Sequence, residues 1–182
     1  MQPTRRKFLV GLTVTATAGT GTMPVVAAEE PHLPSPQGLS SPTGKPILTI
    51  TGKIRVFNTE DAAQFDRPML EALGLAEFTT KTPWYNDPVS FEGVPMVRLV
   101  EAVGAYGGTA IATALNDYET TIPVADFGEF NVLLALKRNG AYMPISDKGP
   151  LFIIYPFDSN PTLRTQKYFS RSAWQLSKLK FA

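Results

Sequence analysis

The chain has 182 residues, of which 43% are hydrophobic and 18% are charged, a composition typical of one globular domain. It contains no cysteine, which excludes disulfides, thiolate metal ligands and a cysteine nucleophile. Its one histidine, His32, lies in a Pro/Ser-rich stretch, so we expect neither a histidine metal site nor a Ser-His-Asp triad in the folded body.

Residues 1–28 are predicted to be a twin-arginine signal peptide. Arg5-Arg6 precede a weakly hydrophobic stretch rich in Thr, Gly and Ala, and Val26-Ala27-Ala28 supplies small residues for cleavage before Glu29. The alternative is a membrane anchor, but Pro24 and the many threonines and glycines make a poor span. The expected location of the mature protein is therefore the periplasm.

The mature chain is expected to be slightly acidic. The signal carries three of the 17 basic residues and no acidic one, which leaves 14 basic against 16 acidic residues and a net charge of −2. This balance argues against a nucleic-acid or anionic-membrane partner. The charge is uneven, because residues 159–182 hold five basic residues and no acidic one.

Residues 29–46 are predicted to be a Pro/Ser-rich linker, and residues 47–182 to be one domain. The linker has five prolines and too little apolar content to pack. A β-branched, apolar run predicts the first strand over 47–56. Asp66 is then expected to cap a short helix over 67–73, because its carboxylate can accept backbone N–H groups of the first turn.

A strand is predicted over 76–82, and a loop over 82–88, which contains two aromatic residues and two prolines. Pro95 is expected near the first position of a second short helix. The buried stripe of that helix is predicted to be Met96, Leu99, Val100 and Val103.

Two β-hairpins are predicted, each from two apolar or β-branched runs with a turn dipeptide between them. They join 109–115 to 118–124 around Asn116-Asp117, and 132–137 to 141–145 around Asn139-Gly140. The run 149–156 has four apolar residues and a tyrosine between two prolines, which predicts a short strand buried on both faces.

The C-terminal part is predicted to be a long polar loop over 158–165 and a strand over 168–181 with a bulge near Ser177. Together these elements give about eight or nine strands and two or more short helices. The predicted fold class is a single, mainly-β α+β domain.

Three segments in this order resemble the oxidoreductase molybdopterin-binding domain, which has the sulfite-oxidase fold. They are FEGVPMVRLVEAVG, ALNDYETTIP and LLALKRNGAYMPISDKGPLFIIYP. The shared pattern is an aromatic-x-Gly-Val opening of a helix, an Asp-Tyr hairpin, a strand before Asn-Gly, and a Gly-Pro run into a buried strand. The resemblance covers nearly all of residues 47–182 and implies that fold.

The chain departs from the enzymes of that family in one respect. Those enzymes bind molybdenum through a cysteine thiolate as well as the pterin dithiolene, and the matching region here, 78–84, has no cysteine. The chain therefore resembles a small, exported, cysteine-free branch, which includes periplasmic proteins that bind reduced pterins and partner with membrane enzymes of cyclic-di-GMP metabolism.

That resemblance implies a non-catalytic periplasmic module that binds a reduced pterin or molybdopterin, without molybdenum, and acts through the periplasmic domain of a membrane signalling protein. Two alternatives stay open. One is a molybdopterin-dependent oxidoreductase with an altered metal ligand, and the other is a structural domain that has lost its ligand. No proton-transfer constellation stands out among the scattered carboxylates.

A pterin site needs an aromatic side chain to stack on and polar groups to read the edge of the ring. Trp84, in a loop with no periodic core role, is the best stacking candidate, although it could instead close the end of the barrel. Asn116 and Tyr118 flank a hairpin turn, where Asn116 could also simply satisfy the turn.

Two further groups of candidates lie near the C-terminus. The resemblance implies that the turn of Asp147, Lys148 and Gly149 faces the ligand, and glycine allows backbone amides to approach a ligand closely. Arg171 and Trp174 lie in an aromatic-rich stretch suited to contact with an anion or a ring face, so we expect Arg171 near the side chain or phosphate of the pterin.

Replacing Arg5 and Arg6 together with lysine should strand the precursor in the cytoplasm, because the twin-arginine pair is the recognised part of such a signal. Cell fractionation with an antibody against the mature domain measures this. Unchanged export of the double variant would contradict the twin-arginine assignment.

Overall fold

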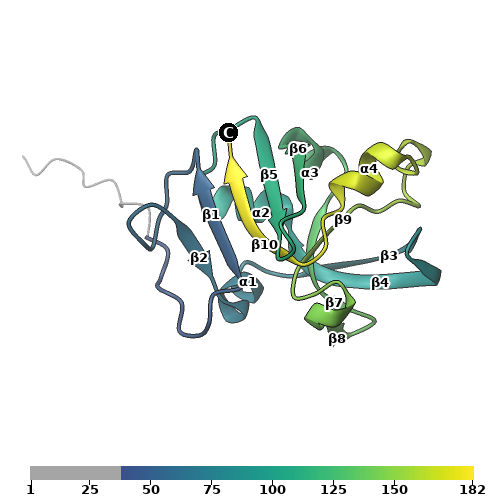
Figure 1. The fold of residues 1–182 in the computed structure, drawn as a ribbon, viewed down its shortest axis with the longest axis horizontal. Helices are drawn as coiled ribbons and strands as arrows, with labels where there is room; N and C mark the ends of the chain where they lie inside the picture. Colours follow the sequence, from purple (N-terminus) through teal and green to yellow (C-terminus); the bar gives the residue numbers. More distant parts are fainter. Residues whose placement is uncertain (1–37) are drawn as a thin grey trace, which may run out of the picture. The chain divides into compact units, whose positions relative to one another are not determined.

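Ten strands in two sheets and four short α-helices make up the computed structural model, which describes residues 38–182 (Figure 1). The predicted signal peptide and residues 29–37 of the predicted linker lie outside the described residues. The described chain is a single small domain, so the predicted α+β class is confirmed. Among the described residues, no helix is long and apolar enough to cross a membrane.

The first sheet has the strand order β2-β1-β10-β5-β6. Neighbouring strands are antiparallel except β1 and β10, which run parallel, so the C-terminal strand lies in the middle of the sheet (Figure 1). The strands are β1 (Leu48–Gly52), β2 (Ala63–Phe65), β5 (Thr109–Ala114), β6 (Glu119–Pro123) and β10 (Leu176–Phe181).

The second sheet has the order β3-β4-β7-β8, and β9 also pairs with β7. All of its pairings are antiparallel. The strands are β3 (Ala76–Thr82), β4 (Tyr85–Pro95), β7 (Leu133–Arg138), β8 (Ala141–Tyr142) and β9 (Phe152–Ile154).

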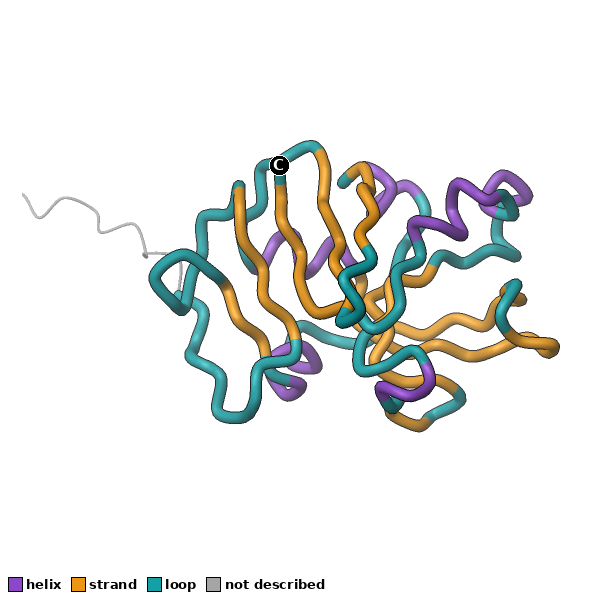
Figure 2. The backbone as a smooth tube through the Cα atoms, viewed as in Figure 1, coloured by secondary structure: helices purple, strands orange, loops and turns teal. Residues whose placement is uncertain are grey.

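The helices are short and connect the strands (Figure 2). They are α1 (Arg67–Ala72), α2 (Met96–Ala102), α3 (Ala125–Glu129) and α4 (Gln166–Arg171), with single 3₁₀ turns η1 (Ile145–Asp147) and η2 (Pro161–Leu163). The sequence analysis missed α3 and β2, because elements of three to five residues carry too few residues to show a period.

Three predictions from local sequence patterns are confirmed: a helix cap, a buried helix face and a hairpin turn. The Asp66 side chain accepts the Met69 N–H at 3.0 Å and caps α1. The predicted stripe of α2 packs inward, with Met96, Leu99 and Val103 fully buried. Asn139 and Gly140 both have positive φ, at 49° and 78°, as a type I′ hairpin turn requires.

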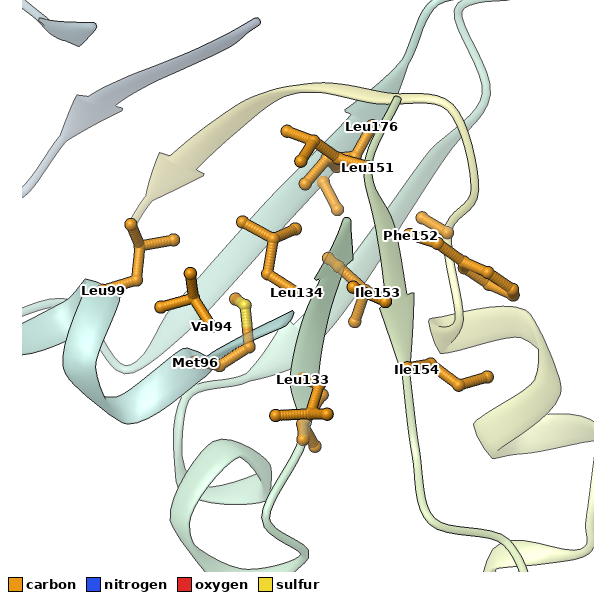
Figure 3. Close-up of a cluster of buried hydrophobic side chains, with 14 of the residues drawn as sticks. Val94, Met96, Leu99, Leu133, Leu134, Leu151, Phe152, Ile153, Ile154 and Leu176 are labelled. Carbon is orange, nitrogen blue, oxygen red and sulfur yellow. The ribbon is translucent and has the colours of Figure 1, made fainter. Parts of the chain in front are cut away.

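The predicted buried strand is also confirmed. All five residues from Leu151 to Tyr155 are completely buried, and β9 forms their centre. Side chains from β4, α2, β7 and β9 gather in one cluster, in which Leu134 and Ile153 come from paired strands (Figure 3). This cluster is the hydrophobic core on which both sheets pack.

Two predictions about the path of the chain were wrong. The residues from 82 to 88 are not a loop, because Thr82 pairs with Tyr85 and only Pro83 and Trp84 form the turn between β3 and β4. Val89 and Phe91 are buried on the inner face of β4, and this burial favours a long strand over an open loop.

The predicted strand over 168–181 is a helix at its start, α4, and a strand only from Leu176. Tyr168 and Phe169, which the prediction placed in or beside the strand, lie on α4, where Tyr168 is buried. The predicted bulge near Ser177 is confirmed by a register shift between Leu176 and Lys178.

The end of the first strand and the packing of the predicted linker also differ from the prediction. The first strand stops at Gly52, which has φ +85°, rather than continuing to residue 56. Residues 38–46 form no regular element, yet they contact the domain: Leu39 packs on the core, and the backbone N–H groups of Thr43 and Gly44 donate to the Asp66 carboxylate at 2.9 and 2.8 Å.

Asp66→Asn should lower the free energy of unfolding at neutral pH. It should also make that free energy fall less steeply as the pH is lowered. Hydrogen bonds from Gly44, Met69 and Thr43 lower the pKa of Asp66 below its ordinary value of 3.8. Because the folded pKa is lowered, the stabilisation is present above the unfolded pKa and is lost as pH falls through the folded one.

Urea unfolding measured between about pH 5 and pH 2 tests this expectation. Asp61→Asn, at an exposed position before β2, is the matched control and should keep the wild-type pH dependence. An Asp66→Asn variant with the same acid sensitivity as the wild type would contradict the assignment.

Candidate functional site

A cavity of about 330 Å³ opens where four segments of the chain meet. These are the β3–β4 turn, the β5–β6 turn, α4 and the residues between α4 and β10. Four of its ten lining residues are aromatic, and its polar lining residues are uncharged. The lining residues are Pro83, Trp84, Asn116, Tyr118, Gln166, Phe169, Ser170, Ser172, Ala173 and Trp174.

The aromatic wall is built around Trp84. Its ring centroid lies 5.5 Å from that of Trp174 and 5.5 Å from that of Phe152, both in edge-on geometry. Phe157 and Phe169 also contact it edge-on. The two alternatives for Trp84, a stacking surface and a core plug, therefore coincide in one side chain, because the ring packs on the core and also lines the cavity.

Trp174, which contacts Trp84 edge-on, forms the rest of this aromatic wall. Its side chain is 36% exposed, so part of the indole faces solvent. The rigid two-residue turn at Pro83-Trp84 and the anchoring of both indoles on Phe152 fix the wall in place.

Several polar groups of the cavity form hydrogen bonds within the protein, and one of these bonds joins two of the cavity walls. The Tyr118 hydroxyl donates to the Ser170 carbonyl at 2.9 Å and so connects the β5–β6 turn to α4. The Asn116 side-chain oxygen accepts the Tyr118 N–H at 3.3 Å and satisfies the turn. The Ser172 hydroxyl donates to the Tyr168 carbonyl at 3.0 Å. Among the described residues that line the cavity there is no Asp, Glu, Lys, Arg or His.

Four of the eight residues predicted for the site thus lie together: Trp84, Asn116, Tyr118 and Trp174. The other four do not line this cavity, and each has its own contacts. Gln166 and Phe169 were missed, because this segment was predicted as a loop running into a strand. The spacing of three and four residues from Gln166 to Phe169 and Ser170 was the helical signal that could have identified one face of α4.

Asp147 and Lys148 belong to an ion network beside the cavity. The Asp147 carboxylate pairs with Arg138 at 2.6 Å and accepts the Tyr85 hydroxyl at 3.3 Å. The hydrogen bond from Arg138 lowers the pKa of Asp147. The Lys148 ammonium lies 4.7 Å from the Tyr85 ring centroid and 5.7 Å from that of Trp174. Through Lys148, this network contacts the Trp174 ring of the aromatic wall.

Gly149 is required for packing. A Cβ at this position would overlap the Met143 carbonyl group. The Gly149 N–H, which the sequence analysis offered to a ligand, donates instead to the Pro144 carbonyl at 2.9 Å. The close approach that glycine permits is therefore between two backbone segments of the same chain.

Arg171 holds α4 in place. Its guanidinium pairs with the Asp126 carboxylate at 2.7 Å, and the Tyr155 hydroxyl donates to the same oxygen at 2.8 Å. The three side chains are largely shielded from water, and burial raises the pKa of Tyr155 well above its ordinary value. This triad joins α4 to α3 and to the end of β9, so it fixes the helix that forms one wall of the cavity.

The fold and the cavity define a small α+β domain with an uncharged pocket lined by aromatic, amide and hydroxyl side chains. Within residues 38–182, no three His, Asp or Glu side chains cluster in a way that could hold a metal ion. The chain matches no protein-family model and no curated protein sequence.

Arg171→Ala should lower the free energy of unfolding by about 3 kcal/mol, because it leaves the largely buried Asp126 carboxylate without its ionic partner. Arg164→Ala is the matched control. Arg164 pairs with Asp158 at the same 2.7 Å, but its side chain is 55% exposed, so the cost should stay below about 1 kcal/mol.

Urea denaturation of both variants gives the comparison. Equal losses for the two variants would show that the Arg171 triad does not anchor α4.

Proposed function

We propose that the chain is an exported, non-catalytic module with the sulfite-oxidase-like molybdopterin-binding fold. It binds the flat ring of a reduced pterin in the aromatic cavity, and it acts through the periplasmic domain of a membrane signalling protein, of the kind that carries a cyclic-di-GMP enzyme. The observation that supports this function best is the cavity itself, in which both tryptophans of the chain converge with neutral amide and hydroxyl groups.

The chemistry of the cavity suits an uncharged bicyclic ring. A volume of about 330 Å³ lies at the lower end of the range of small-molecule sites, which favours a compact ligand. Trp84 and Trp174 offer ring faces and edges, and the amides of Asn116 and Gln166 can both donate and accept hydrogen bonds. The edge of a pterin likewise alternates donors and acceptors.

The absence of charge in the lining favours a reduced pterin over molybdopterin. A molybdopterin phosphate would need cationic partners, and no lining residue among the described ones is cationic. Arg171, which was expected near a phosphate, is engaged with Asp126, and Lys148, from the turn expected to face the ligand, belongs to the Asp147–Tyr85 network. The residues present therefore fit the pterin ring but not the phosphate.

The alternative of a molybdopterin-dependent oxidoreductase has no specific support. The chain has no cysteine to supply the thiolate ligand of the related enzymes, and the lining of the cavity offers no carboxylate or imidazole in its place. The residues that line the cavity also include no Asp, Glu, Lys or His to act as a general acid or base. A module that binds a ligand and then contacts a partner protein needs no metal ligand and no general acid or base, so it agrees better with the residues that line the cavity.

Adding tetrahydropterin to the mature protein should change its intrinsic tryptophan fluorescence, because both tryptophans line the cavity and no other tryptophan contributes. Trp174→Ala should weaken binding by roughly 5- to 150-fold, since stacking on an aromatic side chain contributes about 1–3 kcal/mol per base-like ring. Calorimetric titration of the wild type and the variant measures the affinity directly.

Tyr106→Ala is the matched control, because Tyr106 is 55% exposed and does not line the cavity. Its affinity for tetrahydropterin should equal that of the wild type. Mass spectrometry of the small molecules that co-purify distinguishes the three functions: a reduced pterin supports the binding module, molybdopterin with metal supports the enzyme, and neither supports a structural domain. Unchanged affinity in folded Trp174→Ala would refute the site.

A further inference from the structure

A second cavity, of about 480 Å³, shares no lining residue with the first. It is formed by the stretch before β1, the start of α1, the turn after β5, the segment from Met143 to Ile145, and β10. We call it the basic groove. Several apolar side chains line it, and two of them, Leu115 and Ile145, are 50% and 58% exposed.

Three cationic side chains line the basic groove: Lys45, Arg67 and Lys178. No acidic residue is among the described residues that line it, and none of the three forms an ion pair within residues 38–182. The Arg67 guanidinium lies 4.2 Å from the Tyr142 ring centroid. A carboxylate on the next turn of α1, Glu71, accepts a hydrogen bond from Tyr142 instead.

The cations are spread over the part of the first sheet that runs from β2 through β1 to β10. Arg67 follows β2 and Lys178 lies in β10, and these two strands flank β1. Neighbouring strands lie about 4.8 Å apart, so two strand spacings alone separate the two backbone positions by roughly 10 Å. Gln64 is the β2 residue level with Lys178, and Arg67 lies three residues further along the chain, which adds to this separation. One carboxylate is too small to meet both charges. An extended peptide places alternate side chains about 7 Å apart on one face, so successive acidic residues can reach them.

We propose that the basic groove docks an extended segment of the protein partner in which acidic residues alternate with apolar ones. Alternate side chains of an extended segment point to opposite sides, so the acidic ones turn toward the cations and the apolar ones toward Leu115 and Ile145. Leu115 follows β5, on the other side of β10 from Arg67. The inference rests on the proposed function, because it assigns the surface through which the module contacts its partner. Charge complementarity sets the choice of occupant, since an unpaired cationic rim favours an acidic segment and opposes a basic one.

A fluorescein-labelled peptide that alternates Glu and Leu is the probe, with peptides that alternate Lys and Leu or Glu and Ser as controls. Fluorescence anisotropy on the mature protein should show that the Glu/Leu peptide binds and that both controls bind at least roughly tenfold more weakly. Rising salt should weaken its binding, because the charges involved are exposed.

Lys45→Glu/Lys178→Glu should weaken binding of the Glu/Leu peptide by at least roughly tenfold. Lys53→Glu/Lys180→Glu is the matched control, because it makes the same charge change at exposed lysines outside the groove, one of them on β10 itself. Backbone amide shifts on adding the peptide should gather at residues 143–145 and around Lys178.

Each contrary result overturns the proposal: no binding of the Glu/Leu peptide, equal binding by the Lys/Leu peptide, or equal loss in the two double variants. Self-association of the wild type that the groove variant abolishes would identify a second copy as the occupant and would also overturn it. Tetrahydropterin affinity should be the same in both double variants. Peptide binding without any tetrahydropterin binding would refute the pterin site alone.

Discussion

The complete burial of the segment from Leu151 to Tyr155 is the constraint on which the rest of the structure depends. A strand without exposed residues needs cover on both faces and partners for its backbone along both edges. One edge pairs with β7, and on the other side the Ile153 N–H donates to the Ala173 carbonyl at 2.9 Å. The Leu151 carbonyl accepts the Leu176 N–H at 2.9 Å. The same segment therefore belongs to the second sheet and holds the chain that leads into the central strand of the first.

The aromatic cavity is a consequence of this arrangement. Phe152 of β9 contacts the rings of both Trp84 and Trp174, at centroid distances of 5.5 and 6.3 Å. Directly after β9, the buried Tyr155 hydroxyl joins Asp126 and Arg171, which hold α4 over the other side of the cavity. One buried strand thus positions both the tryptophan wall and the helix opposite it. A site built in this way is rigid before any ligand arrives, which lowers the entropy lost on binding.

Charge separates the two cavities. The described residues that line the aromatic cavity carry no charge, whereas three cations line the basic groove. The proposed ring recognition would depend on shape and hydrogen bonds and change little with salt, whereas the proposed docking at the groove would depend on exposed charges that salt screens. The two surfaces share no lining residue, so the two proposed ligands would not compete for the same side chains.

The sequence by itself determined those features that arise from neighbouring residues. Asp66 as a helix cap, Asn139-Gly140 as a type I′ turn and the buried run after Gly149 depend on local backbone geometry and local hydrophobicity, so their residue types predict them. The tertiary structure decided the rest. Arg171 was read as a ligand-facing cation, but its partner Asp126 lies 45 residues away, and no local pattern encodes that pairing. The stretch 82–88 was predicted as a loop because it contains two prolines, yet burial of the inner face of β4 extends that strand back to Tyr85 and leaves only Pro83 and Trp84 in the turn. The gathering of Lys45, Arg67 and Lys178 at one groove likewise follows from strand order, which contacts between distant segments determine.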